Sequence, residues 1–234
     1  MQIKYIFYSI VVGIFCLGIG LPHELRAETY VDNGRMEGQV KWTKSSSPYI
    51  LRDHIYVPRG SHLELEPGSV VISDPVSTYE IGVDGSLLAI GTESGRIEIQ
   101  ASGIYVVDGT AHFEKVFLDR TPLSVERGTT TLKSVKISGA GPALYAKNSR
   151  VEIDESELVG NESGILSAQW TPIFQVFGIP RAMAAEGDTE NGFDDPNQNH
   201  ITIRNTVFEN NGSYNIKNKT TNVVDAKENW WGVP

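Results

Sequence analysis

The stretch that decides the fold runs from residue 104 to residue 165 and reads IYVVDGTAHFEKVFLDRTPLSVERGTTTLKSVKISGAGPALYAKNSRVEIDESELVGNESGI. Apolar and polar residues alternate in short runs, and Gly, Asn or Asp separates several of these runs. Such alternation is typical of short strands with one buried face, and those three residues are common in sharp turns. The stretch therefore predicts many short strands joined by tight corners.

The stretch also repeats with a period of about 20 residues. Six-residue segments that open and close with an apolar residue start at Phe113, Leu132 and Ile153, which are 19 and 21 residues apart. A fourth segment starts at Ile203, 50 residues further on, and Val224 follows 21 residues later. A second series keeps the same period and consists of Ile104, Leu123, Leu144, Ile165 and, after an insertion, Tyr214.

A period of this length predicts turns that stack on one another. Stacking places equivalent residues about 4.8 Å apart, so each series becomes a ladder inside one core. No part of the repeats is long or periodic enough for a crossover helix, and hairpin signals do not fall between matching strands. The predicted fold is all-β, a single-stranded right-handed parallel β-helix of roughly eight coils with one long loop insertion.

The chain begins like a secretory signal. Lys4 precedes 17 uncharged residues from Tyr5 to Leu21, and Ala27 is a small residue at a suitable cleavage position. The apolar stretch also approaches the length of a spanning helix, so an uncleaved anchor is the alternative. The expected segments are a leader at 1–27, a lead-in or cap at 28–47, the β-helix at 48–234 and, within it, the insertion at about 168–197.

Composition limits the partners. The chain has 20 Lys and Arg against 29 Asp and Glu, a formal net charge of −9. Phosphate binding needs clustered basic side chains, so we expect no nucleic-acid partner, and membrane contact only through an uncleaved leader. Cys16 is the one cysteine and lies in the leader, so the mature domain is expected to be stabilised by packing and not by a disulfide.

Several motifs resemble a known group. The segments PYI (48–50), VPRG (57–60) and LELEPG (63–68) resemble the opening coil of bacterial secreted proteins with right-handed parallel β-helix repeats. GSLLAIGT (85–92) is similar to a coil motif of that group, and NWWG (229–232) resembles its closing motif. The resemblance implies a pectate-lyase-like fold. It does not imply one activity, because the group holds adhesins as well as polysaccharide-processing enzymes.

The resemblance to pectate lyases implies an acidic Ca²⁺ cluster with a nearby basic residue. Calcium needs six to eight converging oxygens. The candidate ligands all lie in the insertion and are Asp188, Glu190, Asp194 and Asp195. Their spacing fits no loop signature, and acidic stretches rich in Gly and Asn are usually solvated loops. We therefore expect no cofactor, with Ca²⁺ at these residues as the alternative.

Glycoside hydrolysis would need two carboxylates at a fixed separation. Glu152 and Asp154 flank the inward Ile153, so both are expected to face outward about 6.6 Å apart. Arg204, on another strand, is the third candidate. That separation is permitted for an inverting enzyme, but any two alternating acids on a strand would show it. A solvated face that limits aggregation is the simpler interpretation.

Aromatic residues are the better ligand candidates, because exposed rings bind the faces of sugars. Trp170, Phe174 and Phe177 lie in the insertion, which is the place where the chain leaves its own repeat. Trp230 and Trp231 are adjacent, so on a strand one would cap the last coil while the other faces outward. Trp42 is expected to cap the first coil in the same way.

The sequence therefore favours a non-catalytic, exported β-helix at the cell surface, in the periplasm or outside the cell. Its expected partner is a polysaccharide or an envelope protein, bound on an outward face near the insertion. A polysaccharide lyase or glycoside hydrolase is one alternative, with Glu152, Asp154 and Arg204 as its residues. A structural spacer is the other.

Overall fold

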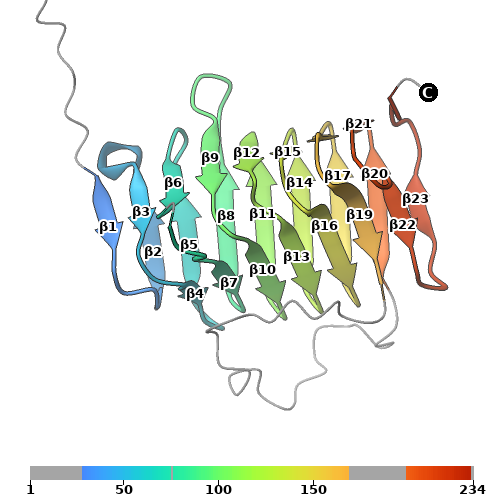
Figure 1. The fold of residues 1–234 in the computed structure, drawn as a ribbon. Coiled ribbons are helices and arrows are strands. Elements are labelled where there is room, and N and C mark those ends of the chain that lie inside the picture. Colours follow the sequence, from blue (N-terminus) through green and yellow to red (C-terminus); the bar gives the residue numbers. More distant parts are fainter. Residues whose placement is uncertain (1–27, 75, 169–198, 233–234) are drawn as a thin grey trace, which may run out of the picture.

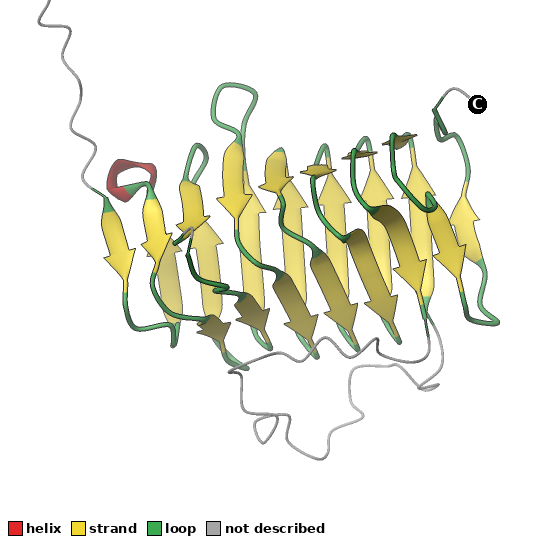
Figure 2. Cartoon of the chain, in the orientation of Figure 1, coloured by secondary structure: helices red, strands yellow, loops and turns green. Residues whose placement is uncertain are grey.

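The chain is a parallel β-helix. The computed structural model describes residues 28–74, 76–168 and 199–232. Within them the chain is all-β except for the 3-10 turn η1 (Lys44–Ser46). Three parallel sheets enclose one core in about eight turns (Figures 1 and 2), which confirms the predicted fold class. The predicted leader and residues 169–198 of the insertion lie outside the described residues.

After the first turn, each turn adds one strand to each sheet, and strands three apart along the chain are hydrogen-bonded neighbours. The first turn has no strand in sheet B, so β1 pairs with β3. Sheet A comprises β1 (Thr29–Val31), β3 (Tyr49–Leu51), β6 (Val70–Ser73), β9 (Ile97–Gln100), β12 (Val116–Asp119), β15 (Lys136–Ser138), β18 (Glu157–Val159) and β21 (Val207–Glu209). Sheet B comprises β4 (Ile55–Val57), β7 (Ile81–Val83), β10 (Ile104–Val107), β13 (Leu123–Glu126), β16 (Pro142–Lys147), β19 (Ser163–Ser167) and β22 (Ile216–Asn218). Sheet C comprises β2 (Gln39–Trp42), β5 (His62–Leu65), β8 (Ser86–Ile90), β11 (Thr110–Glu114), β14 (Thr129–Lys133), β17 (Arg150–Asp154), β20 (His200–Arg204) and β23 (Val224–Ala226).

Strand pairing already begins in the segment expected to be a lead-in. Strand β1 pairs with β3 through Thr29 and Tyr49, and β2 pairs with β5 through Trp42 and Leu65. Residues 28–47 therefore contribute the first turn of the β-helix. These two strands were not predicted, because segments of three and four residues are too short to show a clear alternation.

The core is built from inward-facing ladders. On sheet C the register aligns Trp42, Leu65, Ala89, Phe113, Leu132, Ile153, Ile203 and Ala226. On sheet B it aligns Ile104, Leu123, Leu144, Ile165 and Ile216. Most of these side chains are fully buried, and outward neighbours alternate with them. The predicted ladders are thus confirmed up to their last members.

The last member of each predicted ladder was wrong by two positions. Ile203 pairs with Ala226 and not with Val224, and Ile165 pairs with Ile216 and not with Tyr214. Counted between register partners, the corner from β21 to β22 is one residue longer than the corner from β18 to β19. The corner from β22 to β23 is one residue longer than the corner from β16 to β17, so two extra residues separate Ile203 from Ala226. A shift of two keeps a residue on the same face of a strand, so Val224 still faces inward, opposite Ile201.

A single left-handed residue makes each later corner between sheet C and sheet A. Four of these residues follow a sheet C strand directly, and the fifth, Glu228, comes two residues after β23. Their φ angles lie between 48° and 59°, and the five are Lys115, Ser134, Glu155, Asn205 and Glu228. Left-handed backbone costs about 1–2 kcal/mol for a residue with a Cβ. Only one of the five is Asn and none is Gly, so most of these corners are held against that cost by the ladders on either side.

Stacked aromatic rings close the two described ends of the core. Trp42 is buried and stacks on Tyr49, with ring centroids 4.6 Å apart. At the other end Trp231 stacks on the buried Phe208 at 4.9 Å. Trp230 and Trp231 are each 45% exposed, so the capping tryptophan also keeps part of its surface in solvent. Both rings shield apolar residues that would otherwise lie at an open end of the coil.

Replacing Glu155 by Gly should stabilise the protein by about 1 kcal/mol, because Gly adopts a positive φ without strain. The matched control is Glu155→Ala, which loses the same exposed contact with Ser134 but keeps the Cβ. Urea unfolding of the two variants measures the difference. Equal stability of the Gly and Ala variants would show that the corner is not strained.

Candidate functional site

The corners where sheet B passes into sheet C form a line that we call the B–C edge. Most are tight, as at Asp108-Gly109 and Arg127-Gly128. Between β19 and β20 the chain instead leaves at Ala168 and returns at Asn199, whose Oδ1 accepts a hydrogen bond from the Ser149 amide at 3.0 Å. The predicted insertion therefore joins the β-helix at the B–C edge.

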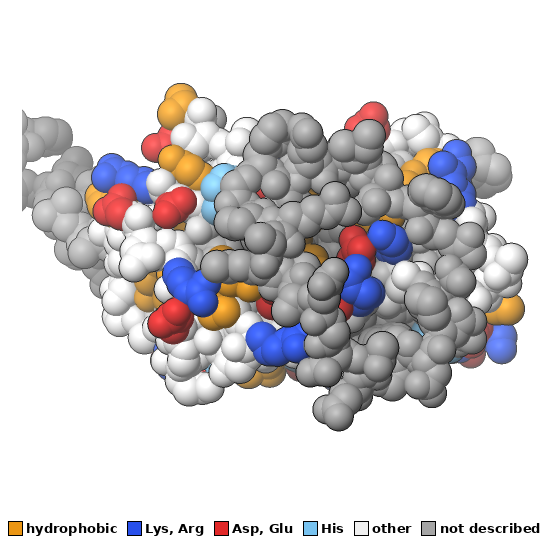
Figure 3. Space-filling model, turned by 90° about the horizontal axis from the view of Figure 1, so that it is seen from below, with side chains coloured by type: hydrophobic (Ala, Val, Ile, Leu, Met, Phe, Trp, Pro, Cys, Tyr) orange, Lys and Arg blue, Asp and Glu red, His pale blue; other side chains and the backbone are white. Residues whose placement is uncertain are grey.

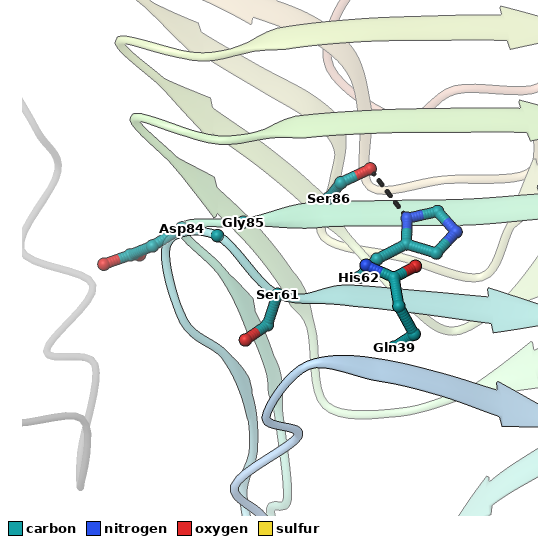
Figure 4. Close-up of a pocket in the computed structure, with 7 residues that line it drawn as sticks. Gln39, Ser61, His62, Asp84, Gly85 and Ser86 are labelled. Carbon is teal, nitrogen blue, oxygen red and sulfur yellow. Dashed lines mark hydrogen bonds between the residues drawn. The ribbon is translucent and has the colours of Figure 1, made fainter.

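A shallow, open depression lies at the same edge, near the start of the coil (Figure 4). Its lining comes from three successive turns and consists of Gln39, Gly60, Ser61, His62, Asp84, Gly85 and Ser86. His62 Nδ1 and Ser86 Oγ share a hydrogen bond of 3.1 Å, and Gln39 lies beside the imidazole. Asp84 points away from His62. The depression thus presents amide, imidazole, hydroxyl and carboxylate groups to a ligand.

On the sheet B side of the edge, the outward residues form a row. Its members share one register position on successive strands and are Tyr56, Gly82, Tyr105, Ser124 and Tyr145. We call this set the tyrosine row. Tyrosines thus occur on every second turn, roughly 9.6 Å apart by the spacing of strands. Tyr56 and Tyr105 are partly exposed, while Tyr145 is buried in a small outer cluster with Leu166 and Ala168.

Hydrogen bonds to carboxylates hold two of these rings in place. The Tyr56 hydroxyl donates to Asp84 Oδ2 at 2.8 Å, which joins the tyrosine row to the depression. The Tyr105 hydroxyl donates to Glu80 Oε1 at 3.3 Å. Burial, followed by the bond to Asp84, raises the pKa of Tyr56 to about 12, and burial with the nearby Glu80 also raises the pKa of Tyr105.

The phenol end of Tyr105 lies against the backbone of Gly103. A Cβ added to Gly103 would lie 2.8 Å from Tyr105 Cε2 and 3.0 Å from its hydroxyl. A glycine is therefore needed for the ring to lie this close to the backbone. Because Tyr105 is partly exposed, the side of the ring away from Gly103 is available for contact.

Glu80 is a buried carboxylate with an incomplete set of partners. It is 9% exposed, and its Oε2 has no hydrogen bond within the described part of the chain. His54 Nδ1, also buried and without a hydrogen bond there, lies 3.9 Å from it. Burial raises the pKa of Glu80, and the bond from Tyr105 opposes that effect in part. Keeping this carboxylate ionised therefore destabilises the fold.

Further along the edge, charges are paired. Arg127 binds Asp108 through two nitrogens, at 2.9 and 3.1 Å, and reaches Glu126 Oε1 at 2.6 Å. Lys147 Nζ binds the same Glu126 oxygen at 2.9 Å. Seen from below, acidic and basic side chains stand next to one another (Figure 3). This part of the edge is therefore close to neutral.

The structure places Glu152, Asp154 and Arg204 on the outer face of sheet C, and for Glu152 and Asp154 this outward position was predicted. Glu152 is exposed, and Asp154 pairs in register with Arg204. Arg204 is bonded to the Asp225 carboxylate and to two backbone carbonyls, while Asn205 donates to Asp154 at 2.9 Å. These contacts join Arg204 and Asp154 to residues of neighbouring turns, which is a structural role.

The remaining predicted candidates fall into two groups. Trp230 and Trp231 lie at the end of the coil, away from the B–C edge residues that line the depression. The others lie outside the described residues, namely Trp170, Phe174, Phe177, Asp188, Glu190, Asp194 and Asp195. In the described ranges, no three His, Cys, Asp or Glu side chains are grouped as a metal site. Those same ranges contain no helix that is long and apolar enough to cross a membrane.

The tyrosine row was missed at the level of sequence. Tyr105 and Tyr145 are 40 residues apart, which is two periods, whereas Tyr56 precedes Tyr105 by 49 residues because the early turns are longer. A search for polar aromatic residues at twice the repeat length would have found Tyr105 and Tyr145 but not Tyr56. The spacing alone does not say which face of the sheet the tyrosines occupy, because a register error of one residue moves a side chain to the opposite face.

Comparison with known proteins adds little. No family model matches the sequence, and no solved structure matches it. A stretch of 87 residues is 34% identical to Protein bark beetle of Drosophila melanogaster. The match covers 30% of this chain and 3% of that protein, so it does not place the chain in a family. The fold expected from the bacterial resemblance is present, and its finer assignment stays a proposal.

Replacing Glu80 by Gln should raise the melting temperature at neutral pH, because Gln keeps the acceptor for Tyr105 and removes the buried charge. The folded-state pKa of Glu80 is raised above its ordinary value of 4.5, so ionisation weakens the wild-type fold above that raised pKa. The gain should shrink as pH falls towards 4.5, where the wild-type carboxyl is protonated. Thermal unfolding from pH 8 to pH 4 measures this.

Glu98→Gln is the control, since it removes one exposed charge from the outer face of sheet A. It should change stability little at any pH. A Glu80→Gln gain that is constant across the pH range would mean that the buried charge is not its cause.

Proposed function

We propose that the protein is a non-catalytic, exported β-helix that binds carbohydrate at the B–C edge. The observation that carries the proposal is the hydrogen bond between Tyr56 and Asp84, which joins the tyrosine row to the polar depression. The ligand would contact both surfaces. Cell-surface, periplasmic and extracellular locations all fit an exported protein with the leader predicted at residues 1–27.

The chemistry of the two surfaces suits a sugar. A sugar ring has apolar C–H faces, which pack on aromatic rings, and a rim of hydroxyls, which both donate and accept hydrogen bonds. Tyr105 offers a ring fixed by Glu80 and Gly103, and Tyr56 a ring fixed by Asp84. The depression offers His62, Gln39 and Ser86 for the hydroxyls. A fixed ring loses little entropy on binding.

The regular spacing supports a chain as the ligand. Tyrosines on every second turn recur at roughly 9.6 Å along the coil, close to the length of a disaccharide. A linear glycan lying parallel to the axis would meet Tyr56 and Tyr105 with successive disaccharides. The insertion joins the β-helix at this same edge, at Ala168 and Asn199, and loops that interrupt a regular repeat often carry function.

Replacing Tyr105 by Ala should weaken glycan binding about tenfold, the effect of losing roughly 1.4 kcal/mol of ring contact. Gly103→Ala should weaken binding as well, because its Cβ displaces the ring while leaving Tyr105 in the sequence. Calorimetric titration with soluble oligosaccharides measures both. The first ligands to test are those found by screening the protein on a glycan array.

Tyr30→Ala is the matched control. Tyr30 lies on β1 of sheet A and is 45% exposed, so its loss removes a similar ring from a different face. Binding that survives Tyr105→Ala and Gly103→Ala, or that falls equally with Tyr30→Ala, would contradict the proposed site.

The protein should release no product from polysaccharides. Arg204 is engaged by Asp225, and Asp154 by Asn205, so neither is free to move a proton to or from a substrate. Incubation with acidic and neutral polysaccharides, with and without Ca²⁺, should yield no unsaturated ends and no new reducing ends. Either product would establish the lyase or hydrolase alternative instead.

A further inference from the structure

We propose that the B–C edge selects amine-bearing glycans over anionic ones, an inference that rests on the proposed carbohydrate function. The ligand class is an oligosaccharide of amino sugars with free ammonium groups. Two carboxylates at the two ends of β7 carry the inference: Asp84 lies on the B–C edge, and Glu80 lies at the opposite end of the strand. Each holds a tyrosine of the row, and neither forms a salt bridge with a lysine or arginine of the described residues.

Asp84 is the carboxylate shared by both parts of the site. It lines the depression, and its Oδ2 accepts the bond from Tyr56, which lies in the row. Asp84 forms no salt bridge with a lysine or arginine in the described ranges. Arg59 and Arg127 lie further away and lower the pKa of Asp84 through their charge. The net effect of burial, with the repulsion of Asp108, is a raised pKa. Asp84 thus lacks a cation in direct contact.

Glu80 lies in the same turn as Asp84, at the other end of strand β7. Its Oε2 is buried and has no hydrogen bond among the described residues, although Oε1 holds Tyr105. His54 is the one basic group of those residues found near it, at 3.9 Å, too far for a hydrogen bond. A donor bound beside Tyr105 would therefore be attracted to an incompletely satisfied carboxylate.

Several cations near the edge are paired with acidic side chains, whereas Arg59 is in no salt bridge among the described residues. Arg127 is held by Asp108 and Glu126, and Lys147 by Glu126. Arg35 lies 5.5 Å from the centre of the Tyr56 ring but is bonded to Glu37 at 2.6 Å. An anionic glycan would meet the two carboxylates without a free basic partner to offset them, apart from the exposed Arg59. An ammonium group would be attracted by the two carboxylates. The affinity for a neutral sugar should therefore lie between the affinities for the cationic and the anionic glycan.

The test compares three oligosaccharides of equal length: a chitosan oligomer, a chitin oligomer and an oligogalacturonate. Calorimetry at low salt should give affinities that fall in that order. Each carboxylate should raise the affinity for the ammonium-bearing chitosan oligomer by up to about fivefold. Asp84→Asn should reduce the chitosan preference by up to about fivefold, since it removes the charge but keeps an acceptor for Tyr56. Binding of the chitin oligomer should change little in this variant.

Glu152→Gln is the matched control, because it removes one negative charge from the outer face of sheet C, away from the depression. This variant should leave unchanged both the order of the three affinities and the ratios between them. Oligogalacturonate binding as tightly as chitosan, or an Asp84→Asn variant with an unchanged ratio, would overturn the charge inference while leaving carbohydrate binding intact. If the glycan array and all three oligomers give no binding, the proposed function itself fails.

Discussion

The structure depends on the stacking of inward side chains in register along three parallel sheets. Each turn buries its apolar residues only against the turns on either side, so no turn is stable alone. Phe113, Leu132 and Ile153 show the arrangement: they lie one above another on sheet C and are almost fully excluded from solvent. The same ladders hold non-glycine residues such as Lys115 in the left-handed conformation at the corners.

This constraint also arranges the outer surface. Because side chains alternate in and out along a strand, a fixed inward ladder produces a fixed outward row. Tyr56 and Tyr105 share a register position only because Ile55 and Ile104 are both aligned with Ile81 inside. A row of this kind repeats at the spacing of the turns, so the coil is suited to a ligand that itself repeats.

The two proposals use different properties of one edge. Carbohydrate binding rests on shape and on rings fixed by Asp84, Glu80 and Gly103. Selection among glycans rests on charge, because neither Asp84 in the depression nor Glu80 at the other end of β7 forms a salt bridge with a lysine or arginine of the described residues. The buried charge of Glu80 weakens the fold, and sites that bind ligands often retain such unfavourable groups.

The sequence by itself determined the β-helix, most of its ladder residues and the outward placement of Glu152 and Asp154, since these follow from a local alternation repeated about every 20 residues. It failed at Val224 and Tyr214, because the last corners are longer than the earlier ones and the ladders end at Ala226 and Ile216. Only the tertiary structure decided that Tyr56, Asp84 and the depression lie together and that the insertion joins the coil at the same edge. The physical reason is that the alignment of side chains from different turns depends on the lengths of all the corners between them. No single repeat contains that information.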